Sequence, residues 1–267
     1  MDNDDKPIGQ ILSRREALTL FGLSGAALLA ACAPEAGSLQ QALATSTSAA
    51  SSPTAAATAG TQASAASLPA CIARPELTEG PYFVDELLER ADVRSDPSDG
   101  SVRPGVPLAL TFLVSTVKDN ACQPLPGVMV DIWHCDAQGA YSDANDGNFG
   151  DQRGKQFLRG YQITDANGLA RFTTIYPGWY QGRAVHIHFK LRNYPPAESG
   201  FDFTSQVFFD DALSEQIFTS QADYAKAGSF LRNAQDGIYG QSGGQTLLTL
   251  TPQAEGYSTT FDIGLTM

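Results

Sequence analysis

From about residue 105 to its end, the chain consists of short hydrophobic runs separated by turn residues. This pattern is typical of β-strands joined by turns, and Asn167-Gly168 is a signal for a tight hairpin. Helical periodicity is weak, and it favours only two short helices, at 211–218 and 221–227. Strands are expected at 106–115, 128–133, 162–164, 169–173, 184–191, 205–209, 246–250 and 258–263.

So many short strands must bury their hydrophobic faces against one another, and two antiparallel sheets packed face to face do this most simply. We therefore predict an all-β fold: a two-sheet antiparallel β-sandwich with short helices and long loops that carry the candidate site. Residues 71–267 have a suitable length for one domain with a single core. The sequence contains no internal repeat and no second domain.

The strand expected at 184–191 contains His186 and His188, two of the three histidines in the sequence. Side chains alternate between the faces of a strand, so both imidazoles point one way while Val185 and Ile187 point the other. Two imidazoles on one face with an apolar row behind them form a rigid pair of metal ligands. The alternative is an exposed His-x-His pair without a ligand.

Two tyrosines follow turns elsewhere in the domain: Gly139 shortly precedes Tyr141, and Gly178 shortly precedes Tyr180. A phenol has a pKa of about 10, so it binds a metal at neutral pH only when a strong Lewis acid displaces its proton. Zinc and copper sites are usually built from imidazole, thiolate or carboxylate, so two phenolates indicate Fe³⁺ instead. A copper protein that uses both histidines and one tyrosine is an alternative, and Tyr176 competes with Tyr180 as a ligand.

The N-terminal residues predict export. Arg14-Arg15 is a twin-arginine pair, and the apolar run 17–31 is too short to span a bilayer as an ordinary helix. The run ends at Cys32 in a sequence that resembles the lipobox of bacterial lipoproteins. We expect a signal peptide at 1–31, lipidation of Cys32 and attachment to the cell envelope; the alternative is a plain signal peptide with an incidental cysteine and a secreted or periplasmic protein.

Residues 32–70 are mostly Ala, Ser and Thr, without hydrophobic periodicity, and predict a disordered tether. The net charge of −12 argues against nucleic acid or anionic lipid as a partner, so any membrane contact is expected through the lipid anchor. Cys122 and Cys135 form a poor disulfide pair because a strand between them holds them apart. A disulfide between Cys71 and either Cys122 or Cys135 is left as an open alternative.

Five segments carry more specific motifs: 78–83, 126–134, 139–142, 158–160 and 176–188. In this order they resemble the intradiol ring-cleavage dioxygenases, of which the catechol and protocatechuate enzymes are the best-known members. The resemblance covers essentially all of 71–267.

The resemblance implies a mononuclear non-haem Fe(III) with solvent as its fifth ligand. It also implies that Arg183 lies beside the bound substrate, that Gln206 supports the site from behind the ligands, and that Pro81 and Tyr82 line the substrate mouth. His134 and Cys135 are left to packing or to a disulfide near the site. The four implied iron ligands are Tyr141, Tyr180, His186 and His188.

The implied reaction opens an aromatic vicinal diol with both atoms of O₂ and gives a muconate-type dicarboxylate. Tyr180 would leave the metal when substrate binds and accept a proton, while Arg183 would stabilise the charge that develops on the ring. Only five residues separate Tyr180 from His186, which implies an open mouth. Which diol reacts and the oligomeric state are left open.

The competing interpretation is a non-catalytic binding module on the cell surface. Residues 123–128 and 164–168 also resemble transthyretin-like sandwich domains, which need no metal. That interpretation gives no reason for two tyrosines and two histidines to fall at matching positions.

Overall fold

The computed structural model describes residues 73–118, 121–146, 149–196 and 200–265. The expected signal peptide at 1–31, the tether at 32–70, Cys32 and Cys71 lie outside these residues, so the predicted domain limits stay predictions. Within the described part, no helix combines the length and the apolar character needed to cross a membrane.

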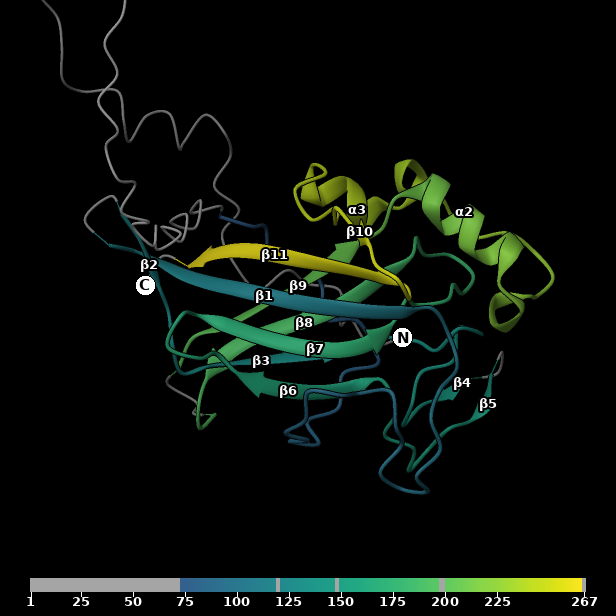
Figure 1. Cartoon of the computed structure of the whole chain (residues 1–267), viewed down its shortest axis with the longest axis horizontal. Helices are drawn as coiled ribbons and strands as arrows, with labels where there is room; N and C mark the ends of the chain where they lie inside the picture. Colours follow the sequence, from purple (N-terminus) through teal and green to yellow (C-terminus); the bar gives the residue numbers. More distant parts are fainter. Residues whose placement is uncertain (1–72, 119–120, 147–148, 197–199, 266–267) are drawn as a thin grey trace, which may run out of the picture. The chain divides into compact units, whose positions relative to one another are not determined.

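Two β-sheets form the described domain (Figure 1). The first sheet has the order β6 (Arg159–Ile163), β3 (Val128–Trp133), β8 (His186–Asn193) and β9 (Asp202–Phe208), and all its pairs are antiparallel. In the second, β10 (Thr251–Pro252) pairs with β11 (Tyr257–Leu265) and β11 with β1 (Pro107–Lys118). β2 (Ala121–Pro124) and β7 (Leu169–Ile175) both pair with β1, while β4 (Asn145–Asp146) and β5 (Gly150–Asp151) form a separate ribbon.

The predicted all-β fold with two sheets is confirmed, with two local differences. β1 and β11 run parallel, because β11 returns to the sheet after a long connection rather than a hairpin. The prediction of a strand at 246–250 is wrong. In this segment only Leu247 forms a β-bridge, to Phe208, and strand pairing begins again at β10. Cys122 is disulfide-bonded and Cys135 is a free buried thiol, so these two do not pair, as expected.

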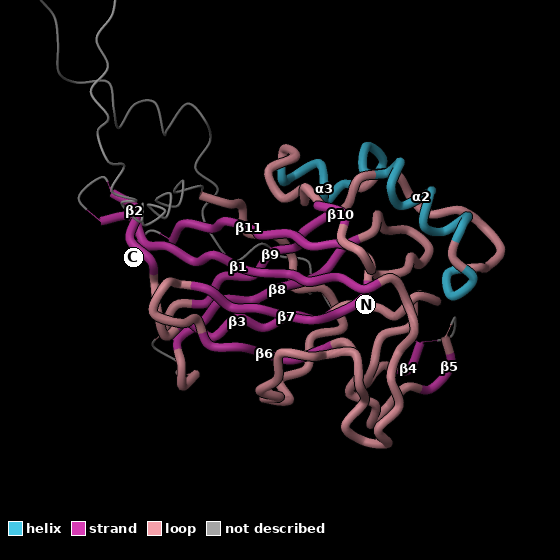
Figure 2. The backbone as a smooth tube through the Cα atoms, viewed as in Figure 1, coloured by secondary structure: helices cyan, strands magenta, loops and turns pink. Residues whose placement is uncertain are grey.

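The helices lie together outside the two sheets (Figure 2). The helix expected at 211–218 is α2 (Asp211–Ser220), whereas the one expected at 221–227 is only the 3₁₀ turn η1 (Ala222–Tyr224). A second 3₁₀ turn, η2 (Asn233–Gln235), precedes α3 (Gly237–Ser242), which the sequence analysis missed. Two glycines weaken the helical signal of α3, and its start depends on Asp236, whose side chain accepts hydrogen bonds from Ile238 N and Tyr239 N.

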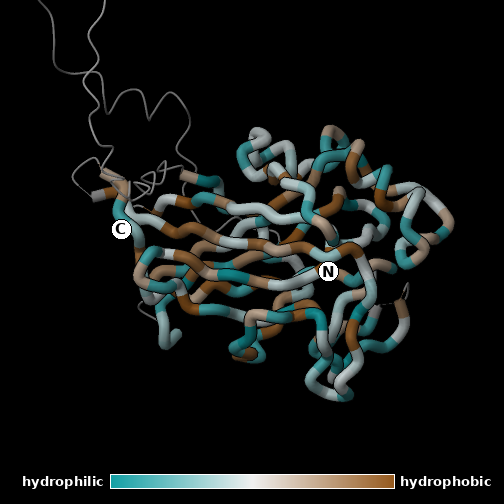
Figure 3. Tube along the Cα trace, in the orientation of Figure 1, coloured by the Kyte–Doolittle hydropathy of each residue, from teal (hydrophilic) through white to brown (hydrophobic). Residues whose placement is uncertain are grey.

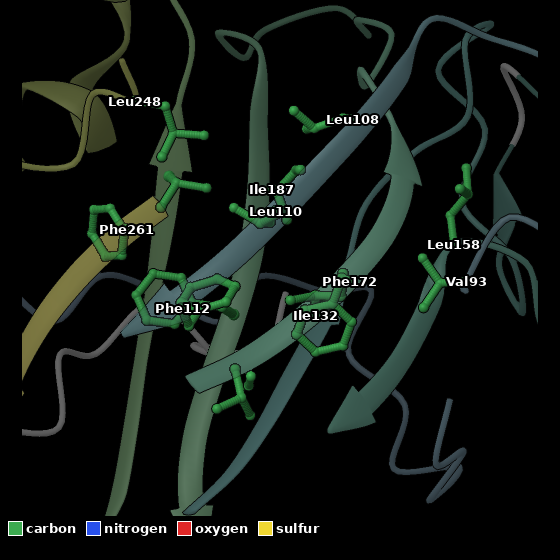
Figure 4. Close-up of a cluster of buried hydrophobic side chains, with 14 of the residues drawn as sticks. Val93, Leu108, Leu110, Phe112, Ile132, Leu158, Phe172, Ile187, Leu248 and Phe261 are labelled. Carbon is green, nitrogen blue, oxygen red and sulfur yellow. The ribbon is translucent and has the colours of Figure 1, made fainter. Parts of the chain in front are cut away.

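The main core lies between the two sheets. β1 buries Leu108, Leu110 and Phe112 on its inner face, and Figure 3 shows hydrophobic residues recurring along the central strands. The aromatic rings then meet across the sandwich, with Phe112 and Phe189 centroids 5.0 Å apart and Phe189 and Phe261 centroids 5.6 Å apart. Figure 4 shows Phe112 and Phe261 among the buried side chains of this core. This packing fixes β8 against the second sheet from one side.

The opposite face of β8 is also buried, although it is polar. His186, His188, Lys190 and Arg192 alternate with the core residues and are at most 9% exposed. They are covered by the N-terminal arm, defined here as residues 73–90. Leu77 N of this arm donates to Thr204 O of β9 at 3.0 Å, and the Phe83 ring of the arm lies against the Lys190 and Arg192 side chains.

Buried charges on this face are paired. Arg192 donates to Asp131 at 3.0 Å on the neighbouring strand and to Asp85 of the arm at 2.6 Å. Lys190 pairs with Glu79 of the arm and, at 3.2 Å, with Asp202. Because removing one partner leaves the other charge buried, these pairs hold the arm in place.

We expect Arg192→Ala to destabilise the protein by about 3 kcal/mol near pH 8, because Asp131 is left buried without its cation. Burial already raises the pKa of Asp131 to about 6, and the substitution raises it further. A raised carboxyl pKa contributes stability that is lost as pH rises through it, so the loss should be smaller at pH 5. Urea unfolding at both pH values measures this.

The matched control is Arg171→Ala, which removes an exposed pair with Asp165 and should change stability little at either pH. Equal losses for the two variants would show that the arm is not held by the buried charges.

Candidate metal centre

Close contact between two loops brings Tyr141 and Tyr180 together. The backbone at Gly139 has φ +94°, and a Cβ there would overlap the carbonyl oxygen of Trp179. In the second loop, Gly178 N donates to Asp136 O at 3.1 Å, and a Cβ at Gly178 would overlap the backbone of the first loop. Glycine at these two positions therefore lets the tyrosine-bearing loops touch through their backbones.

The two histidines project from β8 on one face, as strand alternation predicts. His186 Nδ1 donates to the carbonyl oxygen of Ala184 at 2.6 Å, and since a carbonyl only accepts, Nε2 presents its lone pair. The indole of Trp133 stacks on the His188 ring at 5.0 Å with an angle of 11°. Gly80 of the arm also lies close to His188, since an added Cβ would be 3.1 Å from His188 Cε1.

Donor atoms of all four side chains meet around His186 Nε2. It lies 3.0 Å from His188 Nε2, 3.4 Å from Tyr141 Oη and 3.3 Å from Tyr180 Oη. Two ligands about 2.0–2.2 Å from one ion and roughly at right angles are about 3 Å apart. The four donors therefore fit a single mononuclear metal ion. In the described ranges no group of three or more His, Cys, Asp or Glu side chains could hold a metal ion, which leaves this imidazole–phenol set as the candidate.

Burial sets the protonation states of these donors. It lowers the pKa of His186 to about 3, with a further contribution from the Arg183 cation, and it lowers the pKa of His188 well below its ordinary value. Both imidazoles are thus neutral, the form that binds metals. Burial raises the pKa of Tyr180 to about 12 and that of Tyr141 well above its ordinary range. The phenols therefore need a strong Lewis acid to displace their protons.

Tyr82 of the arm reaches the site, while Pro81 is exposed beside it. The Tyr82 ring stacks on Tyr141 with centroids 4.2 Å apart and an angle of 13°, and it meets the Tyr180 ring edge-on at 6.3 Å. The arm thus contributes a wall of the site as well as its cover. Whether Pro81 and Tyr82 contact a substrate stays a prediction.

Arg183 and Gln206 lie side by side. Arg183 Nη2 donates to Gln206 Oε1 at 2.6 Å, and Gln206 Nε2 donates to Thr78 O of the arm at 2.7 Å. Gln206 is fully buried and stands opposite His188 in the β8–β9 register. Arg183 Nε donates to Asp236 at 2.9 Å, a residue that no motif in the sequence marks as part of the site.

Three other candidates are not part of the donor set. The hydroxyl of Tyr176 hydrogen-bonds Ser214 at 2.7 Å in the core, so Tyr176 does not compete with Tyr180. His134 Nε2 bonds the Thr174 hydroxyl at 2.7 Å, and Cys135 is a free buried thiol. His134 and Cys135 pack near the site, as expected, although Cys135 forms no disulfide.

An open hollow of about 570 Å³ adjoins the centre. Its walls include Trp179, Gln181 and Lys226, and of the four donors Tyr180 is the one that lines it. Tyr141, by contrast, is 2% exposed and lies beneath Tyr82. The two phenols are therefore unequal, because Tyr180 alone faces open space.

A dioxygenase family model matches residues 78–227. The catechol 1,2-dioxygenase of Acinetobacter baylyi is 34% identical over 113 residues, which are 40% of this chain and 32% of that protein. The chlorocatechol 1,2-dioxygenase of Pseudomonas sp. strain P51 is 27% identical over 157 residues, which are 52% of this chain and 56% of that protein. The solved intradiol ring-cleavage dioxygenase from Tetranychus urticae has a TM-score of 0.61 at 29% identity and covers 73% of this chain and 94% of its own.

The family match spans more than half of the chain, and the solved structure has the same two-sheet fold. The chain belongs to the intradiol ring-cleavage dioxygenase family. Since the matched segments cover only 32% and 56% of the two curated relatives, membership does not by itself assign a substrate.

We expect protein supplied with ferric iron to bind it stoichiometrically. His188→Ala should weaken iron binding at least about tenfold, because loss of a residue that only hydrogen-bonds to a metal ligand already has an effect of this size. Elemental analysis after desalting measures the bound metal. His134→Gln is the matched control, because His134 is equally buried but lies outside the donor set. Iron retention in His188→Ala equal to that of the wild type would contradict the proposed ligands.

Proposed function

We propose that this protein is a non-haem Fe(III) intradiol dioxygenase that opens an aromatic vicinal diol of the catechol type with O₂ and releases a muconate-type dicarboxylate. The observation that carries the proposal is the meeting of two neutral imidazoles and two phenols, whose other three donor atoms all lie within 3.4 Å of His186 Nε2. Hard phenolate oxygens favour ferric over divalent ions, which distinguishes this site from copper and zinc centres.

Bound there, ferric iron would hold both diol oxygens and withdraw electron density from the ring. Tyr180 has the position to exchange with the substrate, because it lines the hollow. With a phenol pKa raised to about 12, Tyr180 would readily accept a proton from a diol hydroxyl. Tyr141, stacked under Tyr82, stays in place and keeps the donor set together.

Arg183 supplies a permanent cation next to the donors. Its charge reaches the centre, since it helps to lower the pKa of His186. A planar guanidinium in this position stabilises negative charge that develops on the ring during the reaction. Gln206, hydrogen-bonded to Arg183, holds it from behind.

Substrate class follows from the hollow and from the relatives. The curated relatives are named for catechol and chlorocatechol, both small vicinal diols. The hollow beside Tyr180, about 570 Å³ and open, leaves room for ring substituents. We therefore propose catechol-type diols with tolerance for bulkier ring substituents.

We expect the iron-loaded protein to be coloured by its tyrosinate ligands and to consume O₂ with catechol or a substituted catechol. Tyr180→Phe should lower kcat/KM by about 10²–10⁴-fold, the usual contribution of a positioned proton acceptor, while retaining iron. An oxygen electrode and elemental analysis measure the two effects. Tyr176→Phe is the control, because Tyr176 lies in the same segment but bonds Ser214 in the core.

A colourless protein that binds no iron and consumes no O₂ with catechol, protocatechuate, hydroxyquinol or larger diols would leave the transthyretin-like binding module as the better interpretation. Copper with comparable affinity and no ring cleavage would favour the copper protein.

We also propose export by the twin-arginine route and a lipid anchor at Cys32, from the motifs at Arg14-Arg15 and 17–31. Membrane attachment comes through this lipid alone. Expressed in a bacterial host, the full chain should fractionate with the cell envelope, and Cys32→Ser should release it in soluble form. Replacement of Arg14 and Arg15 by lysine should retain it in the cytoplasm. A Cys32→Ser protein that stays in the membrane fraction would contradict the anchor.

A further inference from the structure

Asp236 is a buried carboxylate, 4% exposed, that connects the C-terminal segment to the candidate centre. Its Oδ2 accepts hydrogen bonds from Arg183 Nε at 2.9 Å and from Ala184 N at 2.8 Å. Its Oδ1 accepts from Ile238 N at 2.7 Å and from Tyr239 N at 3.2 Å. One carboxylate therefore joins the start of α3 to the segment that leads into β8.

Arg183 is held at two points of its planar group. Asp236 binds Nε and Gln206 binds Nη2, so the plane and the direction of the guanidinium are both fixed. The pair is well shielded, with the Arg183 side chain 17% and the Asp236 side chain 2% exposed. Burial alone would raise the pKa of Asp236, but the hydrogen bond from Ala184 N and the Arg183 cation hold it below its ordinary value. The carboxylate is thus charged when it holds Arg183.

The same carboxylate also fixes the backbone on the approach to the histidines. Ala184 N donates to Asp236, and Ala184 O accepts from His186 Nδ1 at 2.6 Å. Ala184 thus transmits the position of Asp236 to the imidazole that lies at the centre of the donor set. The ring centroid of the α3 residue Tyr239 lies 5.2 Å from that of Phe208, which lies 5.9 Å from that of His186. These ring contacts are a second connection between α3 and His186.

We propose that Asp236 is the positioning residue for Arg183, and that it sets how tightly the centre binds a diol and the charge that develops on its ring. The proposal rests on the proposed function, because it needs a substrate for Arg183 to meet. Oδ1 of Asp236 is enough to cap α3. Oδ2 has a different set of partners, because it accepts hydrogen bonds from the Arg183 guanidinium and from Ala184 N.

Asp210 offers a matched control within the same chain. It caps α2 in the same way, by accepting from Ala212 N and Leu213 N, and both acceptor bonds use Oδ1. None of its side-chain hydrogen bonds in the described part of the chain reaches Arg183, Gln206 or a donor. Asp210→Asn therefore reports the cost of disturbing a helix cap without disturbing the site.

The experiment compares Asp236→Asn with Asp210→Asn, each in the wild type and in Arg183→Ala. Asparagine cannot accept at both ends, so Asp236→Asn should lower kcat/KM for catechol by about 10- to 100-fold, the scale of a hydrogen bond to a charged group. The catechol affinity, followed through the shift of the visible absorption, should fall while iron content stays at the wild-type level. In Arg183→Ala the same substitution should have a clearly smaller effect on both quantities, because the guanidinium that it positions is gone and only its contact with Ala184 N remains.

Comparable losses of thermal stability in Asp236→Asn and Asp210→Asn, with wild-type catechol affinity and kcat/KM in both, would overturn the positioning role and leave a helix cap. A full loss that persists in Arg183→Ala would also overturn it, since Asp236 would then act through another group. A wild type that binds iron but no diol would refute the proposed function, which separates that failure from this one. Asp236→Glu, which keeps the charge, should recover part of the catechol affinity.

Discussion

The structure depends on the burial of both faces of β8. One face packs Ile187 and Phe189 into the core, and the other presents His186 and His188 beneath the arm. A strand buried on both faces has no solvent to hydrate its polar side, so a polar group there without a protein or metal partner is costly. Among the described residues, His188 Nδ1 is such an atom, because it is buried and has no hydrogen-bond partner. This constraint explains both the paired charges at one end of the strand and the neutral imidazoles at the other.

The buried polar side chains at the two ends of β8 are accommodated in different ways. Lys190 and Arg192 are matched by carboxylates from the arm and from neighbouring strands, which makes that end self-contained. At the other end, two imidazoles and two phenols are brought together without any carboxylate among them. Four lone pairs that point at one place repel one another, and burial opposes a charge on each donor. The arrangement is therefore unfavourable without a cation, and such locally unfavourable arrangements are typical of functional sites. The polar end thus stabilises the fold, while the donor end is prepared for a ligand.

Much of this arrangement could be predicted from sequence, because it follows from local rules. Strand alternation put His186 and His188 on one face, and the glycine before Tyr141 marked the turn that presents it. What local rules lack is any signal for contacts between distant segments. The arm has no periodicity, yet Gly80 and Tyr82 form walls of the site. Likewise, nothing near Asp236 in the sequence indicates that it meets Arg183, 53 residues away.

The same reasoning explains the errors in the predicted elements. Hydrophobic character at 246–250 predicted a strand, but Thr246 and Leu248 are buried beside Phe208 through a single bridge rather than a ladder. The parallel pairing of β1 and β11 depends on where the chain returns after α2 and α3, which no local pattern encodes. A local hydrophobic pattern indicates that a segment is buried. It does not distinguish a strand from an extended segment that lies beside a sheet without pairing with it along its length.

The inequality of the two tyrosines would let a rigid sandwich exchange one ligand, as the proposed function requires. Tyr141 is 2% exposed, its ring lies against Tyr82, and its loop is locked to the neighbouring loop at Gly139, so moving it would open the packing of the arm. Tyr180 borders the hollow and follows directly on the same contact, at Trp179. Its side chain can turn toward open space while its backbone stays fixed. In the proposed function Tyr180 is therefore the donor that would move when a substrate enters, while the two histidines and Tyr141 would keep their geometry.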